Sequence, residues 1–170
     1  SALNVIESGY QVALMSPTEI LANQHYSLAK KIFPNEIKFR LFTGKTKPVD
    51  KKNIISDLKS SNINMIFGTH SLFQKKTLFN KLGYIIIDEQ HKFGVKQRKL
   101  LSDKGGSNCD ILLMSATPIP RTLTMTIYGD MDLSVINEKP KNRKEIITYS
   151  KKEENINDVI SFVRNEINNK

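Results

Sequence analysis

The sequence predicts an α/β protein built on a largely parallel sheet flanked by helices. Short apolar runs typical of buried strands alternate along the chain with longer stretches of helical spacing. Small polar or acidic residues follow five of these runs, as they do at the carboxyl ends of parallel strands, where ligands bind. The length of 170 residues and the hydrophobic content of 39% fit about one domain with a buried core.

The first predicted elements are a strand, a helix and a second strand. Residues 11–16 (QVALMS) form an apolar run that ends at a proline. Residues 19–33 place apolar side chains near helical spacing, and Pro34, which cannot continue a helix, ends them. Residues 37–42 alternate between apolar and polar side chains, which indicates a half-buried strand.

The middle of the chain continues this alternation. Residues 50–60 have helical spacing, and residues 62–69 (NINMIFGT) form a strand that leads into a loop. Two further apolar strands are predicted at 84–87 and 111–114, and the first of them ends on two acidic residues. A helix is predicted over 121–128.

The last part of the chain predicts a separate strand–helix pair. Residues 137–144 (NEKPKNRK) are polar and include a proline, which is typical of a linker. Residues 145–149 predict a final strand, and residues 153–168 predict a final helix. That helix carries one apolar face, made of Ile156, Val159, Ile160, Val163 and Ile167.

Composition narrows the class of protein. Lys and Arg total 26 against 17 Asp and Glu, and the resulting net charge of +9 favours polyanions, although it also fits solubility or a biased composition. No apolar run reaches the ~20 residues needed to cross a bilayer, and the N-terminal residues lack the layout of a signal peptide. A single cysteine excludes an internal disulfide and fits a cytoplasmic location. His25 and His70 lack the spacing of metal ligands, so no zinc site is expected.

The segment 84–95 (YIIIDEQHKFGV) carries the first candidate site. Its apolar residues lead into the adjacent carboxylates Asp88 and Glu89. At a strand end, one acid can hold the water shell of Mg²⁺ and its neighbour can orient an attacking water, and phosphoryl transfer needs both tasks. An isolated pair would more simply be a helix cap and a solvated side chain. The preceding strand and the following Gln90 and His91 favour the catalytic interpretation.

Residues 112–122 (LLMSATPIPRT) carry the second candidate site. Ser115, Ala116 and Thr117 stand at the end of a buried strand, where the two hydroxyls could hydrogen-bond His91 or the acids and move when the nucleotide changes. The same composition is ordinary in turns. Together with the acidic segment upstream, these residues indicate the coupling role more specifically than they would alone.

Backbone amides and hydroxyls at three further strand ends form the third candidate site. Such groups at helix N-termini and glycine turns bind phosphates without reading bases. Each position alone is more simply a helix cap or a turn. Their placement on successive strand ends suggests a track along one strand of nucleic acid. The residues are Pro17, Thr18, Thr43, Gly44, Gly68, Thr69 and His70.

Four strings carry a resemblance to a known family. They are ALMSPTEILANQHY (13–26), FGTHSLFQ (67–74), IIIDEQHKFGVKQR (85–98) and LLMSATPIPRTLTMTIYGDMDLSVINEKP (112–140). In this order the chain resembles superfamily-2 helicases and, within them, the RecG-type branch-migration helicases. Transcription–repair coupling translocases share the ATPIPRTL element, but typically carry a DEEQRFGV-like string where this chain has DEQHKFGV.

The resemblance implies a RecA-like fold and roles for the matched residues. Asp88 and Glu89 resemble the Walker B pair, as a Mg²⁺ ligand acting through water and as the water-activating base. Gln90 and His91 complete that motif and would couple hydrolysis to DNA contact. Residues 115–117 resemble motif III.

The other matched positions resemble motifs that contact DNA. Pro17, Thr18 and Glu19 resemble motif Ia, and the residues of the other two strand ends resemble its neighbouring DNA-backbone motifs. The resemblance implies ATP and Mg²⁺ as cofactors, and single-stranded, double-stranded or branched DNA as the partner. It also implies ATP-powered remodelling of stalled forks and Holliday junctions in recombination and repair, at the bacterial nucleoid.

The sequence departs from the family in one respect, because no GxxxxGK[ST] phosphate loop occurs in it. In the family that loop lies just upstream of a segment resembling residues 3–14. We therefore expect an incomplete sheet, with residues 1–138 forming part of motor domain 1 and residues 139–170 forming a linker and the start of motor domain 2. Such a piece alone should lack ATPase activity, and the missing strand would lie beside the one ending at Ser115. A different superfamily-2 translocase and a non-catalytic basic DNA-binding module remain alternatives.

Overall fold

The computed structural model describes residues 1–89, 103–106, 109–117, 132–138, 148 and 150–168. The chain divides into two compact units, Ser1–Pro120 and Arg121–Lys170, which are considered separately. Within the described residues, no helix is both long enough and apolar enough to span a bilayer. The first unit contains the sheet and all the described candidate site residues.

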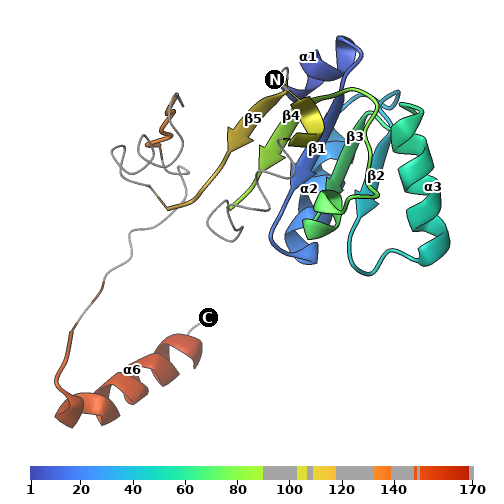
Figure 1. The fold of residues 1–170 in the computed structure, drawn as a ribbon. Coiled ribbons are helices and arrows are strands. Elements are labelled where there is room, and N and C mark those ends of the chain that lie inside the picture. Colours follow the sequence, from blue (N-terminus) through green and yellow to red (C-terminus); the bar gives the residue numbers. More distant parts are fainter. Residues whose placement is uncertain (90–102, 107–108, 118–131, 139–147, 149, 169–170) are drawn as a thin grey trace. The chain divides into compact units, whose positions relative to one another are not determined.

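Five parallel strands form the centre of the first unit (Figure 1). They are β1 (Gln11–Met15), β2 (Phe39–Phe42), β3 (Met65–Gly68), β4 (Leu82–Ile87) and β5 (Asp110–Leu113). Their order across the sheet is β2-β3-β1-β4-β5, and every neighbouring pair is parallel. The predicted α/β class with a parallel sheet is confirmed, and each of the five strands overlaps a predicted one.

Helices connect these strands. α1 (Ala2–Glu7) precedes β1, α2 (Glu19–Ile32) follows it, and α3 (Pro48–Lys59) joins β2 to β3. A short 3-10 helix, η1 (His70–Phe73), follows β3. The sequence predicts α2 and α3 but does not predict α1, because its six residues are too few to establish a helical period.

Alternating side chains give the sheet two apolar faces. On β1, Ala13 and Met15 pack in one cluster together with side chains of α3. Val12 and Leu14 pack in the other cluster, together with side chains of α1 and α2. Because both faces are covered, every residue of β1 is buried. This explains why its sequence is a continuous apolar run rather than an alternating one.

One buried polar side chain, Gln11, ties the sheet to neighbouring segments. It is 2% exposed. Its Nε2 donates to the carbonyl oxygens of Leu58 and Ile63, both at 3.0 Å. Its Oε1 accepts from the backbone amides of Asn80 at 2.9 Å and Lys81 at 3.2 Å. The amide group therefore uses both donors and both acceptor sites inside the protein.

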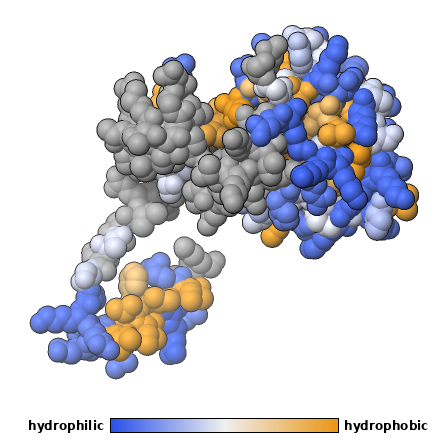
Figure 2. Space-filling model, viewed as in Figure 1, coloured by the Kyte–Doolittle hydropathy of each residue, from blue (hydrophilic) through white to orange (hydrophobic). Residues whose placement is uncertain are grey.

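The second unit contains η4 (Glu153–Asn155) and α6 (Ile156–Asn168). The predicted final helix is thus confirmed. Its apolar face is exposed and is visible as an orange patch on that unit in Figure 2. The predicted helix at 121–128 and strand at 145–149 lie outside the described residues, except for Thr148.

Candidate functional site

The five candidate strand ends lie along one edge of the sheet, because all five strands are parallel. Across that edge the order is Thr43-Gly44 after β2, Gly68-Thr69 at β3, Pro17-Thr18 after β1, Asp88-Glu89 after β4 and Ser115 after β5. The predicted phosphate-binding positions therefore occupy three neighbouring strands. The two acids follow β4, which pairs with β1 on the side opposite to β3.

Asp88 and Glu89 follow β4 directly, and both are partly buried. The amide of Asp88 donates to the carbonyl oxygen of Met15 at 2.9 Å, which extends the pairing of β4 with β1 by one residue. Glu89 has a φ of 50°. This left-handed backbone costs a residue with a side chain about 1–2 kcal/mol, and such strain gathers at functional sites. The chain therefore leaves the sheet through a strained turn at the second acid.

A histidine from α2 contacts the first of these acids. Nε2 of His25 lies 2.8 Å from Oδ2 of Asp88, although the two residues are 63 positions apart in sequence. The side chains are 29% and 18% exposed, respectively. A hydrogen bond to a carboxylate in such a partly buried position is shorter and stronger than one between neutral groups. His25 therefore holds one carboxylate oxygen of Asp88.

The register of α2 explains why His25 reaches the end of β4. Ala22 and Ala29 are the buried residues of this helix. His25 lies three positions after the first and four before the second, so all three share one face. Tyr26, beside them, packs edge-to-face against Phe67 of β3 with ring centroids 5.8 Å apart. The helix is thus fixed on the sheet with His25 turned toward the strand ends.

The N-terminal end of α2 carries two predicted residues. Pro17 is partly buried, and Thr18 is exposed. Oγ1 of Thr18 accepts a hydrogen bond from the amide of Leu21 at 3.3 Å, so Thr18 is the N-cap of the helix. The first turn of α2 therefore presents an exposed hydroxyl at a helix N-terminus, which is a favourable place for a phosphate.

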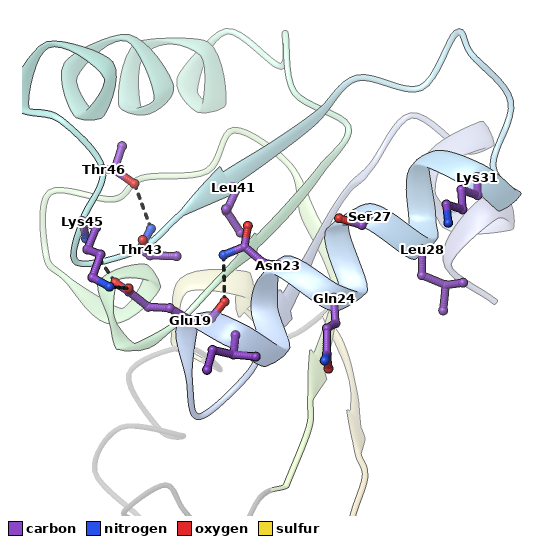
Figure 3. Close-up of a pocket in the computed structure, with 11 residues that line it drawn as sticks. Glu19, Asn23, Gln24, Ser27, Leu28, Lys31, Leu41, Thr43, Lys45 and Thr46 are labelled. Atoms are coloured by element: carbon purple, nitrogen blue, oxygen red, sulfur yellow. Dashed lines mark hydrogen bonds and ion pairs between the residues drawn. The ribbon is translucent and has the colours of Figure 1, made fainter.

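An open cavity of about 790 Å³ lies between α2 and the turn that follows β2 (Figure 3). Glu19 of α2 is bound to that turn through Lys45. Its Oε1 accepts from the amide of Lys45 at 3.1 Å, and its Oε2 lies 3.3 Å from Nζ of the same lysine. Within the turn, the amide of Thr43 donates to Oγ1 of Thr46 at 3.0 Å. The candidate residues after β1 and β2 are therefore linked.

Glu19 keeps its negative charge in this position. Desolvation raises its pKa, but hydrogen bonds from Lys45 and Thr43 and the positive charge of Lys45 outweigh this effect and leave the pKa below its ordinary value. On the α3 side of the turn, Nζ of Lys51 donates to the carbonyl oxygen of Gly44 at 3.2 Å. The Thr43-Gly44 turn is therefore held from two helices.

The end of β3 is closely packed around Gly68. This residue pairs with Phe42 of β2. A Cβ atom added to Gly68 would collide with the carbonyl oxygen of Phe42 and would lie 3.0 Å from Cγ of Leu72. The position therefore requires glycine for a packing reason. His70, two residues later, is exposed.

Two buried hydroxyls stand at the ends of the neighbouring strands β1 and β3. Ser16 is fully buried and Thr69 is 2% exposed. Neither Ser16 Oγ nor Thr69 Oγ1 has a hydrogen-bond partner in the part of the chain that the structure describes. An unsatisfied buried polar group costs roughly 1–3 kcal/mol, so these two hydroxyls make this end of the sheet locally costly. Sequence reasoning identified Thr69 here but gave Ser16 no separate role.

Ser115 and Thr117 hydrogen-bond each other after β5. Oγ of Ser115 lies 3.2 Å from both Oγ1 and the carbonyl oxygen of Thr117, and the amide of Thr117 lies 3.3 Å from Ser115 Oγ. Both residues and Ala116 are exposed. These contacts are those of a local turn. The predicted partner His91 lies outside the described residues, as does Gln90.

Asp88 and Glu89 offer carboxylate oxygens, which are suitable ligands for a divalent cation. Among the described residues, no group of three His, Cys, Asp or Glu side chains could hold a metal by protein ligands alone. Mg²⁺ needs fewer, because it usually keeps several waters and binds through one or two carboxylates together with phosphates. Asp88 stands at the open edge of the sheet with one oxygen oriented by His25. Its donor chemistry therefore fits Mg²⁺ held through water.

Known proteins resemble the chain along most of its length. A family model described as DEAD/DEAH box helicase matches residues 1–126. The ATP-dependent DNA helicase RecG of Aquifex aeolicus is 53% identical over 150 residues, which are 87% of this chain and 19% of that protein. The RecG protein of Streptococcus pneumoniae is 46% identical over 162 residues, which are 95% of this chain and 24% of that protein. The chain thus spans about a fifth to a quarter of these curated relatives, and the predicted resemblance to RecG-type helicases is confirmed.

A solved structure supports the fold. The DEAD-box helicase Mss116 bound to ssRNA and UDP-BeF matches with a TM-score of 0.57 and 18% identity, over 74% of this chain and 30% of that one. At this identity the likeness concerns the fold alone. The predicted RecA-like sheet is confirmed by it.

Proposed function

Because the chain belongs to the DEAD/DEAH box helicase family, we propose that it supplies part of the ATP-hydrolysis and DNA-contact edge of a RecG-type DNA helicase. One observation carries this proposal. The acids after β4 share a sheet edge with the positions after β1, β2 and β3 that the sequence predicts to bind phosphate. The longer protein would use ATP to remodel branched DNA such as stalled forks and Holliday junctions.

In this proposal Asp88 and Glu89 take different tasks. Asp88 holds the water shell of Mg²⁺, which when bound neutralises charge on the phosphates of ATP. Glu89 accepts a proton from the attacking water. The left-handed backbone at Glu89 supports this division, because a change of backbone conformation between two adjacent residues lets their carboxylates serve different positions.

Two further groups of residues would connect hydrolysis to movement. Gln90 and His91, which complete the acidic motif in the sequence, would couple it to DNA contact. Ser115, Ala116 and Thr117 would respond to the nucleotide, and they stand on β5, which pairs directly with β4. The hydroxyls of Ser115 and Thr117 are exposed and can exchange their mutual hydrogen bond for another.

The other half of the edge would bind the DNA backbone. Thr18 offers a hydroxyl at a helix N-terminus. The turn at Thr43 and Gly44 offers backbone groups held in place by Glu19. Pro17, Gly68, Thr69 and His70 complete this surface. The net charge of +9 supports a polyanionic ligand.

The organisation of the longer protein is part of the proposal. Residues 1–138 would belong to the first motor domain, and residues 139–170 would form a linker and begin the second. DNA as substrate implies a place at the bacterial nucleoid. ATP hydrolysis would also need a phosphate loop to bind the phosphates of ATP. The sequence motif of that loop does not occur among these 170 residues, so another part of the longer protein would supply it.

The test is ATP hydrolysis by the full-length protein on a synthetic fork. Glu89→Gln should abolish the DNA-stimulated rate, because an amide cannot take the proton of the attacking water. Glu36→Gln, at an exposed position outside the strand ends, is the matched control and should leave the rate unchanged. DNA-stimulated turnover in Glu89→Gln would exclude the assigned base, and a preference for linear over branched DNA would favour another type of translocase.

A further inference from the structure

We propose that His25 is a positioning residue for Asp88, and that α2 links the metal-holding carboxylate to the DNA-contacting end of the same helix. The inference rests on the proposed function and adds a residue to it. Nε2 of His25 and Oδ2 of Asp88 are 2.8 Å apart. This contact joins α2, the helix that follows β1, to the end of β4.

The hydrogen bond from His25 uses only one of the two carboxylate oxygens of Asp88. A hydrogen bond to Oδ2 limits rotation of the Asp88 carboxyl plane and leaves Oδ1 for the water shell of a metal. Replacing a group that orients a metal-binding residue in this way typically weakens metal affinity or activity by roughly 10–100-fold. Because an ionised carboxylate can only accept a hydrogen bond, the imidazole is the donor in this contact.

The helix that carries His25 also carries the candidate DNA contact. Thr18 caps its N-terminus, and His25 follows seven positions later. Seven residues of helix span about 10 Å and two turns, so the two positions lie near one face. Because α2 is one continuous helix from Glu19 to Ile32, a shift of its N-terminus on DNA binding would move His25 with it.

The pair has a simpler interpretation as an anchor of α2 on the sheet. The helix has other anchors, since its two alanines are buried and Tyr26 packs against Phe67. The pair is thus one of several anchors, and its loss alone should lower the melting temperature only slightly. Loss of His25 should therefore weaken metal binding if it orients Asp88, and should lower the melting temperature if it only anchors α2.

Two substitutions of His25 place a hydrogen-bond donor at different distances from Asp88. His25→Gln keeps an amide nitrogen near the position of Nε2, whereas His25→Asn places its amide near the position of Nδ1, too far from Asp88. In the full-length protein with a non-hydrolysable ATP analogue, Mn²⁺ binding is measured by electron paramagnetic resonance. We expect His25→Asn to weaken Mn²⁺ binding by roughly 10–100-fold and to raise the Mg²⁺ requirement of ATP hydrolysis similarly. His25→Gln should stay near the wild type, and both variants should keep its melting temperature and DNA affinity.

Three results would overturn the inference. Unchanged Mn²⁺ affinity in His25→Asn would reject it while leaving the proposed function intact. Equal losses in the Asn and Gln variants would show that the donor at Nε2 is not what matters. A wild-type protein that binds no Mn²⁺ with the analogue would reject the proposed function as well.

A double-mutant cycle covers the case in which His25→Asn folds poorly. The cycle compares the wild type, His25→Leu, Asp88→Asn and the double variant. His25→Leu removes the hydrogen-bond donor and places an apolar side chain there. The inference requires that His25→Leu weaken Mn²⁺ binding when Asp88 is present and add no further loss in the Asp88→Asn background. Additive losses would overturn it.

Discussion

Nε2 of Gln11 donates to the carbonyl oxygen of Leu58 at 3.0 Å and thereby joins the first residue of β1 to the end of α3. The same side chain also binds the carbonyl oxygen of Ile63 and the amides of Asn80 and Lys81. These backbone groups lie 47 to 70 positions away from Gln11 in the sequence. A single buried amide therefore satisfies the polar groups where β3, β4 and α3 meet β1.

Replacing Gln11 by Met should destabilise the chain by about 2–4 kcal/mol, because four backbone groups lose the hydrogen bond that Gln11 supplies while the side-chain volume is nearly kept. Urea unfolding measures the effect as a lower midpoint with an unchanged slope. Gln24→Met, at an exposed position of α2, is the control and should change little. Equal midpoints for the two variants would contradict the role given to Gln11.

Gly68→Ala should destabilise the sheet edge by about 1–3 kcal/mol, because the added methyl group meets the backbone of Phe42, which cannot move aside as a flexible side chain could. The melting temperature should fall by several degrees. Gly44→Ala is the matched control, since its added Cβ would lie 3.4 Å from Glu19 Oε1, an ordinary contact. A similar loss at both positions would contradict the packing argument.

Cys109 should react slowly with thiol reagents in the folded chain. Burial, followed by the negative charge of Asp110, raises the pKa of its thiol to about 11 from an ordinary value of 9.0. The raised pKa leaves less thiolate at any lower pH, so alkylation at pH 8 should be roughly a hundredfold slower in the folded state than in urea. The rate should climb steadily from pH 8 toward pH 11. A rate that levels off near pH 9 would contradict the raised pKa.

The 170-residue chain alone should show no measurable ATP hydrolysis, because no phosphate loop occurs in it to hold the nucleotide. Its DNA binding should be weak and should fall steeply as salt is raised, because backbone contacts release counterions. Fluorescence anisotropy at several salt concentrations measures this, with the full-length protein as the reference. Nanomolar binding at physiological salt would contradict the prediction.

Much of the fold could be predicted from the sequence, because strands covered on both faces are continuous apolar runs. The segment 11–16 is of this kind, and it differs from β1 by one residue at its end. The order of strands in the sheet could not be predicted this way. β1 is central and β2 is at the edge, although they are neighbours in the chain. That order depends on long-range pairing, which leaves no local pattern.

The candidate site was predictable where a short motif carries its chemistry, as at Asp88 and Glu89. His25 lacks the spacing of a zinc ligand, and the sequence around it predicts no other role. Its partner lies 63 residues away, and the contact exists only because α2 packs across the sheet. One local signal was present, since His25 shares the helical face of Ala22 and Ala29.

The central position of β1 has a consequence for synthesis of the protein. β1 is made first among the five strands, yet Val12 pairs with Met65 of β3, which emerges 53 residues later. At about 5–20 residues per second, the interval is roughly 3–10 s. During this time the apolar segment Gln11–Met15 has neither of its sheet neighbours, so it must be shielded by early contacts with α1 and α2 or by a chaperone on the ribosome.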